Sequence, residues 1–143
     1  EPGEGLATAI AKQRLGGLII IEKKVGLRHV LESGKLIDAE VSPELIATVF
    51  SKNSPLHDGA LVVRGRRIAA AACVLPLLQN PGLSERQFGM RHRAGLGIAA
   101  ESDAVALIIS EETGGISIAS GIDFVRQIPP AELEKKLEFF LRQ

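Results

Sequence analysis

The sequence predicts one α/β domain, in which a mixed, twisted β-sheet is flanked by helices. The 143 residues contain 45% apolar and 24% charged side chains, which is typical of a single folded globular domain. Two continuous apolar runs of strand length, 18–21 and 104–109, are typical of strands buried on both faces. Helical segments lie between the strands, and at least one strand pair forms a hairpin, which favours a mixed sheet.

The first half of the chain alternates helices with strands. Ser42 suits an N-cap and Pro43 the first helical position, while Gly65 separates two apolar runs as a hairpin turn does. In chain order we expect a helix near 7–11, a strand at 18–21, a helix at 27–31 stopped by Ser33 and Gly34, a helix from Ser42 to Phe50, and strands at 60–64 and 67–76.

The second half repeats this alternation. We expect a helix carrying 91–100, a strand at 104–109, a turn at 113–115, a strand at 116–119 and a helix from Pro130. The last helix has one apolar face, formed by Leu133, Leu137, Phe140 and Leu141.

Composition excludes several functions. Lys plus Arg and Asp plus Glu both number 17, so no overall charge attracts nucleic acid or an anionic membrane. Without Trp or Tyr, the chain lacks stacking platforms for single strands. No apolar run approaches the roughly 20 residues that span a bilayer, and no signal peptide is visible. The single cysteine, Cys73, lies in an apolar run and is interpreted as a buried, inert thiol that suits a reducing cytoplasm.

Three polar clusters stand where strands meet loops or helices. The first is His57-Asp58-Gly59, just before the strand at Ala60. A carboxylate beside an imidazole suits a divalent metal or an activated hydroxyl, and glycine permits close backbone approach. The alternative is an aspartate that caps a turn.

The second cluster is Gly89-Met90-Arg91-His92-Arg93, which opens a helix. Two guanidiniums and an imidazole beside free backbone N–H groups make a cradle for anions. Because the helix dipole disfavours cations at this end, an external anion or partner carboxylates are expected. The alternative is a solvated basic turn.

The third cluster, Ser110-Glu111-Glu112-Thr113-Gly114-Gly115, follows a buried strand. Its adjacent carboxylates repel unless one faces solvent or a cation binds, and an acidic loop end is the alternative. A phosphate cradle with dispersed Asp, His and Glu is what metal-assisted phosphoryl transfer requires.

Other nucleotide and hydrolase motifs do not fit. No P-loop pattern occurs. Residues 95–100 match the letters of a dinucleotide fingerprint, but they continue a helix, so helix packing is the better interpretation. Residues 115–119 fall one short of a nucleophile elbow and lie in a strand. His29 has no acidic neighbours and is interpreted as a surface helix residue.

The three clusters closely resemble those of the diadenylate cyclase (DAC) family, also called the DisA N-terminal domain. The similarity includes residues 37–39 and 71–77 and runs from about Leu6 to at least Ser120. The nearest subtype is the membrane-anchored CdaA type. The resemblance implies the DAC fold, with residues 1–143 as the catalytic domain of a longer bacterial protein, lying in the cytoplasm after N-terminal transmembrane helices.

The resemblance also implies roles for individual residues. Asp58 activates the ribose 3′-hydroxyl directly or through the metal, and Arg91 and Arg93 act with it in catalysis. His57, Asp58 and Glu112 ligate Mg²⁺ or Mn²⁺. The nucleotide is bound by Gly59, Ala60, Leu75, Met90, Arg91, His92, Arg93, Ser110 and Glu112, with the Leu75 backbone at the adenine.

Two positions depart from the family pattern. Met90 stands where the family usually has Thr, and a thioether cannot donate a hydrogen bond. Val74 stands where CdaA members often have a Tyr beside the adenine, so ring stacking is lost. Gly95, where Ala is usual, is interpreted as harmless.

The activity expected is condensation of two ATP molecules into cyclic di-AMP with release of two pyrophosphates. Each subunit of a homodimer, or of a higher oligomer, would bind one ATP, and two subunits would meet face to face. By resemblance, a regulator with a YbbR domain and phosphoglucosamine mutase are partners, and nucleic acid is not. The alternative is a catalytically impaired module that binds or senses nucleotide, with Met90 marking the degenerate site.

Overall fold

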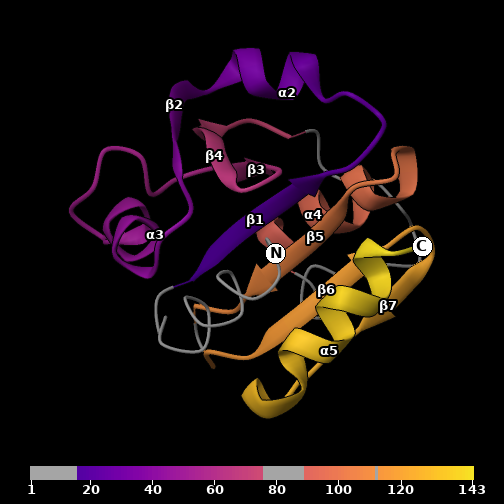
Figure 1. Cartoon of the computed structure of the whole chain (residues 1–143). Coiled ribbons are helices and arrows are strands. Elements are labelled where there is room, and N and C mark those ends of the chain that lie inside the picture. The colour runs from indigo at the N-terminus through magenta and orange to yellow at the C-terminus, as the bar shows by residue number, and fades with distance from the viewer. Residues whose placement is uncertain (1–15, 76–88, 112) are drawn as a thin grey trace.

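A seven-stranded mixed sheet with helices on both faces forms the molecule, as the sequence predicts (Figure 1). The computed structural model describes residues 16–75, 89–111 and 113–143. Its strands are β1 (Gly17–Glu22), β2 (Lys35–Glu40), β3 (Ala60–Arg64), β4 (Arg67–Cys73), β5 (Val105–Ile109), β6 (Ile116–Ser120) and β7 (Asp123–Val125). Its helices are α2 (Arg28–Ser33), α3 (Pro43–Phe50), α4 (Met90–Glu101) and α5 (Pro130–Leu141).

β1 lies at the centre of the sheet. The strand order is β2-β4-β3-β1-β5-β6-β7, so the apolar run expected to be a central strand occupies the middle position. Ile19 pairs in parallel with Leu61 of β3 and antiparallel with Leu107 of β5. All other neighbouring strands in the described sheet are antiparallel, including the predicted β3–β4 hairpin.

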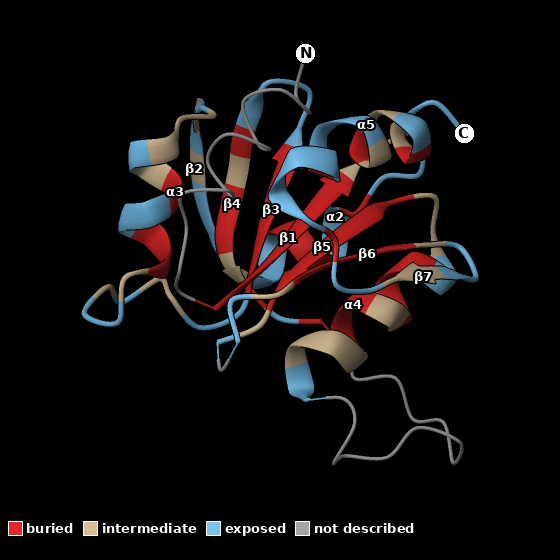
Figure 2. Ribbon diagram, turned by 90° about the horizontal axis from the view of Figure 1, so that it is seen from below, coloured by how far each residue is buried: buried red, intermediate tan, exposed pale blue. Residues whose placement is uncertain are grey.

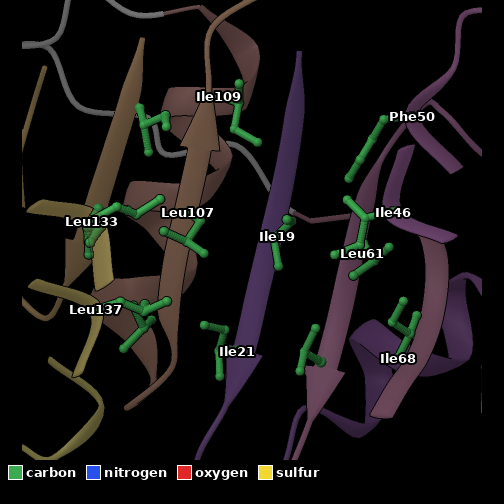
Figure 3. Close-up of a cluster of buried hydrophobic side chains, with 14 of the residues drawn as sticks. Ile19, Ile21, Ile46, Phe50, Leu61, Ile68, Leu107, Ile109, Leu133 and Leu137 are labelled. Atoms are coloured by element: carbon green, nitrogen blue, oxygen red, sulfur yellow. The ribbon is translucent and has the colours of Figure 1, made fainter. Parts of the chain in front are cut away.

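Two apolar layers hold the helices to the sheet. On one face, Ile46 and Phe50 of α3 and Leu133 and Leu137 of α5 pack against β1, β3 and β5 (Figure 3). On the other face, α2 and α4 contribute the second cluster of buried residues, which includes Val30, Leu31, Ala94 and Ile98. The central strands are therefore buried on both sides, whereas β2 at the edge is largely exposed (Figure 2).

Local signals in the sequence set the helix ends. The backbone N–H of Leu45 donates to the Ser42 hydroxyl over 3.0 Å, and Pro43 occupies the first turn of α3. α5 begins at Pro130 and buries Leu133, Leu137 and Phe140, as its apolar spacing predicts. At Gly95, a Cβ would lie 2.8 Å from Ile108 Cδ1, so this glycine lets α4 approach β5. This contact confirms the helix-packing interpretation of residues 95–100.

Two edge strands, β2 and β7, were not predicted from the sequence. β2 exposes much of its length and β7 has three residues, so neither carries the buried apolar run by which the inner strands were found. β4 ends at Cys73, while the expectation extended it to Pro76, which lies outside the described residues. The helix expected near 7–11 also lies outside them. Among the described helices, none has the length and apolar character needed to cross a bilayer.

Candidate active site

A pocket of about 960 Å³ opens at one end of the sheet. It forms where β1, β3 and β6 begin, where β4, β5 and β7 end, and where α4 presents its first turn. Predicted site residues that line it are Asp58, Gly59, Ala60, Leu75, Met90, Arg91, His92 and Ser110. The topology thus brings segments that are far apart in sequence to one cavity, as the interpretation of the three clusters requires.

The 57–59 segment enters β3 through a tight turn. His57 Nδ1 lies 2.8 Å from the Ser54 carbonyl oxygen, and because a carbonyl can only accept, Nδ1 carries the proton. The ring lone pair is therefore on Nε2. Asp58 is exposed at the pocket wall, while His57 is half-buried and lies outside the lining.

Gly59 is required by the fold as well as by the pocket. Its φ of +97° lies in the region that favours glycine, and a Cβ there would be 2.7 Å from the carbonyl oxygen of Cys73. Ala72, opposite, also has a positive φ of 54°, and the β3–β4 register shifts between Ala60 and Val62. These irregularities direct residues 72–75 into the pocket lining.

The end of β4 forms the wall where the adenine is expected. The Ser33 hydroxyl accepts a 2.8 Å hydrogen bond from the Val74 N–H, and α2 thereby holds this strand end. Leu75 is buried, whereas Val74 is exposed at the mouth. Cys73 is buried, as predicted, and burial raises the pKa of its thiol to about 11, which disfavours the reactive thiolate.

Arg91 joins the second and third clusters. Its Nη1 lies 3.4 Å from a Glu111 carboxylate oxygen, so the cation at the start of α4 faces the turn after β5. Gly16 fits beneath this pair, because a Cβ there would be 2.7 Å from both Arg91 Nη1 and Glu111 Cβ. The carboxylate offsets the unfavourable position of Arg91 at the helix N-terminus.

His92 and Arg93 take different directions. The half-buried His92 ring packs edge-on against Phe124, with 6.2 Å between ring centroids. Burial, and then the charge of Arg126, lower the pKa of His92 below its ordinary value of 6.5. Because successive helical residues differ by about 100°, Arg93 points away from Arg91, and it lies outside the pocket lining.

Backbone hydrogen bonds close the turn after β5. The Ser110 N–H donates to Gly115 O and the Gly114 N–H to Ser110 O, each over 2.9 Å. The Ser110 hydroxyl accepts from the Thr113 N–H over 3.3 Å, so its own proton points elsewhere. Gly114, with φ +74°, makes the turn possible. Glu112 lies outside the described residues.

The described residues fit a metal only in part. Asp58 and His57 Nε2 are suitable donors, but no group of three or more His, Cys, Asp or Glu side chains gathers within residues 16–75, 89–111 and 113–143. Mg²⁺ typically takes one or two protein ligands and completes its shell with phosphates and water. Two protein donors beside a nucleotide are consistent with that pattern.

Several residues that line the pocket were not predicted from the sequence as site residues. They are Glu111 and Thr113, named only as parts of a cluster, and Ser117, Arg126 and Gln127. The last two follow β7, a strand that was not predicted, so nothing indicated which way they point. His29 is exposed on α2, as expected.

A family model described as the DisA bacterial checkpoint controller nucleotide-binding domain (DAC) matches residues 6–123. The chain is similar to the cyclic di-AMP synthase CdaA of Bacillus subtilis, with 43% identity over 90% of this chain and 47% of the relative. It is similar to a diadenylate cyclase of Listeria monocytogenes, with 42% identity over 90% of this chain and 46% of the relative. The chain therefore spans about half the length of these curated relatives.

Solved structures share the fold. The crystal structure of a double mutant of DacA from Staphylococcus aureus matches with a TM-score of 0.90 and 41% identity, covering 99% of this chain and 95% of that one. The structure of a hypothetical membrane spanning protein from Bacillus cereus matches with a TM-score of 0.83 and 32% identity, covering 90% and 64%.

Proposed function

Because the chain belongs to the DAC family, we propose that it is the catalytic domain of a diadenylate cyclase, which condenses two ATP molecules into cyclic di-AMP and two pyrophosphates. The observation that carries the proposal is the convergence of Asp58, Arg91 and Ser110 on one pocket at one end of the sheet. An acceptor for a proton, a cation for phosphates and a hydroxyl donor are the groups that nucleotidyl transfer needs.

The residues that line the pocket have different roles in one half-reaction. The 3′-oxygen of one ATP forms a bond to the α-phosphorus of the other, the bond to the bridging oxygen breaks, and pyrophosphate leaves with that electron pair. The exposed Asp58 carboxylate accepts the hydroxyl proton. Arg91 and His92 hold the phosphates, Ser110 donates to a phosphate oxygen, and Leu75 contacts the adenine. Gly59 and Ala60 border the ribose, and Met90 borders the mouth.

We propose a homodimer, or a higher oligomer, as the catalytic unit. Each pocket takes one ATP, and the product needs two equivalent attacks, so two pockets must face each other about a two-fold axis. Facing pockets make the second attack effectively intramolecular. Arg93, which lies outside the pocket lining of its own subunit, remains a predicted phosphate ligand.

His57, Asp58 and Glu112 would hold Mg²⁺ or Mn²⁺. The metal would screen the negative charge of the phosphates. Because His57 donates from Nδ1 to Ser54, its ring is already oriented with Nε2 as the ligating atom.

The whole protein is proposed to be membrane-anchored, with this domain in the cytoplasm. A structural relative is called a membrane spanning protein, which supports an anchor outside residues 1–143. A regulator with a YbbR domain and phosphoglucosamine mutase remain predicted partners.

A second candidate is a nucleotide sensor with little turnover. Met90 exposes 70% of its surface at the pocket mouth, where it brings no hydrogen-bond donor. Nucleotide binding without product would favour this candidate over the cyclase.

Incubation of the chain with ATP and Mg²⁺ or Mn²⁺, followed by chromatography of the products, tests the cyclase directly. We expect cyclic di-AMP and pyrophosphate from the wild type. Asp58→Asn should lower the rate at least about a hundredfold, because it removes the proton acceptor.

Asp123→Asn is the matched control, because Asp123 is an exposed aspartate outside the pocket lining. It should keep wild-type activity, and both variants should unfold at the wild-type temperature. Full activity in Asp58→Asn would overturn the assigned role.

A further inference from the structure

The segment after β7 contains a bulge that faces the pocket. β6 and β7 pair as Ser120 with Asp123 and as Ile118 with Val125. Beyond β7, the Ile128 N–H donates to Ile116 O over 2.9 Å, one residue out of that register. Two residues, Arg126 and Gln127, therefore stand opposite the single residue Ser117, as in a β-bulge.

The bulge carries backbone strain on the pocket side. Gln127 has a φ of +56°, which a residue with a side chain adopts only where its surroundings require it. Both Arg126 and Gln127 line the pocket, and a Cβ at Gly115 would lie 3.8 Å from Gln127 Oε1. The strained segment thus directs two polar side chains into the cavity, beside the turn after β5.

Ser117 is a buried hydroxyl in the same wall. It is 4% exposed and lines the pocket, yet within the described part of the chain no hydrogen bond reaches its side chain. A buried hydroxyl without a partner is destabilising, because it has lost its hydrogen bonds to water and gained none from the protein. Its position is therefore explained if a ligand supplies the partner.

Arg126 brings positive charge to this wall. Its guanidinium carbon lies 6.0 Å from the centroid of the Phe124 ring, and the same ring packs against His92. Because Arg126 and His92 both lie against the Phe124 ring and both line the pocket, they border a common region of it. A cation, an imidazole and a hydroxyl around one cavity suit a phosphate group.

The pocket runs across the strands of the sheet, so the strand order shows which lining residues lie at each end of the pocket. Val74 and Leu75 lie at the β4 end, Asp58 at β3, Arg91 and Ser110 near β5, and Ser117 and Arg126 at the β6–β7 end. A nucleotide with its base at β4 extends its phosphates toward β7. Resting on the proposed function, we infer that Arg126 and Ser117 form the subsite for the terminal β- and γ-phosphates, the part that leaves as pyrophosphate.

Calorimetric titration with an ATP analogue that carries a methylene bridge between its α- and β-phosphates, and separately with AMP, tests this subsite without turnover. Arg126→Gln should weaken binding of the analogue about tenfold or more and change AMP binding less than twofold. Ser117→Ala should weaken the analogue about threefold, again with AMP unchanged. Arg126→Lys should recover part of the lost affinity, because it keeps the charge without the planar fork.

The matched control is Arg66→Gln, which removes an exposed arginine from the hairpin at the other end of the sheet and should leave both affinities unchanged. Equal loss of analogue and AMP binding in Arg126→Gln, or no loss of either, would overturn the subsite. If Arg126→Gln makes cyclic di-AMP from ATP with wild-type affinity, the subsite fails and the cyclase stands. If the wild type selects the triphosphate through Arg126 but forms no cyclic di-AMP, the subsite stands and the cyclase fails.

Discussion

The two ends of the sheet differ in how far their charged and polar groups are paired with one another. At the end away from the pocket, polar groups satisfy one another. Glu22, whose side chain is only 6% exposed, accepts from Arg64 Nε over 2.5 Å and from the Leu27 N–H over 2.8 Å. Asp103 accepts from the N–H groups of Lys24 and Val25. These bonds tie loops to strands.

At the pocket end, polar groups converge without being fully satisfied by the protein. Asp58 is exposed, Ser117 is buried with no hydrogen bond to its hydroxyl in the described chain, and the Arg91–Glu111 contact is long at 3.4 Å. Ala72 and Gln127, two of the three non-glycine residues with a positive φ in the described chain, also lie at this end; the third, Asp38, lies in the edge strand β2. The same sheet therefore has one end where hydrogen bonds and ion pairs stabilise the loops, and another where, within the described residues, positive φ angles and a buried hydroxyl without a partner lower stability.

The largest expected contrast comes from two glycines at opposite ends of β3. Gly59→Ala should lower the free energy of unfolding by roughly 3 kcal/mol, because it combines an unfavourable φ with a clash against the Cys73 carbonyl oxygen. Because the neighbouring Asp58 moves as well, cyclic di-AMP formation should be lost. Chemical denaturation and the product assay measure the two effects.

Gly65→Ala is the control for this change. Gly65 has a φ of +63° at the hairpin turn, and nothing lies within 4 Å of a Cβ there. The strain alone should lower stability by about 1–2 kcal/mol, with activity retained. Equal effects of the two substitutions would remove the distinction between the two ends.

A smaller effect, on stability alone, is expected at Glu22. Burial acts to raise the pKa of its carboxyl, but the hydrogen bonds from Arg64 and Leu27 outweigh it and hold the pKa below the usual 4.5. Glu22→Gln should lower the free energy of unfolding by about 2 kcal/mol at pH 7. Since the folded-state pKa is lowered, the difference from wild type should be full above pH 4.5 and fade as the pH falls through the lowered pKa.

Glu32→Gln is the matched control, because Glu32 forms an exposed i,i+4 pair with Arg28 on α2. Its effect should stay below about 0.5 kcal/mol. Both variants should keep wild-type product formation within twofold, and a large loss of activity in Glu22→Gln would show that the two ends are coupled.

Features whose signal lies within a few neighbouring residues could be predicted from the sequence, whereas features that depend on contacts between distant segments could not. The central strand at 18–21, the Ser42 cap and the Gly65 hairpin carry their signals within a few residues. The three clusters were found for the same reason. The places of Ser117 and Arg126 in the pocket could not be predicted. Ser117 is an isolated serine in an apolar strand, and Arg126 follows a three-residue edge strand. Only the bulge between these two strands, which is not visible in the sequence, brings the two residues together. The need for a glycine at position 59 likewise comes from across the hairpin, because a Cβ there would clash with the backbone of Cys73.

The smallest expected effect is a proton taken up on binding at the pocket end. Burial, and then Arg126, keep the pKa of His92 below 6.5, so the free site holds a neutral imidazole near that pH. A phosphate bound beside the ring favours the charged form and raises this pKa. Binding of the triphosphate analogue should therefore take up a fraction of one proton near pH 6.5 and none near pH 8.5. Calorimetry in two buffers of different ionisation enthalpy measures the uptake. His92→Gln should abolish it, whereas His29→Gln, on the exposed face of α2, should not; uptake that persists without His92 would assign the proton to another group.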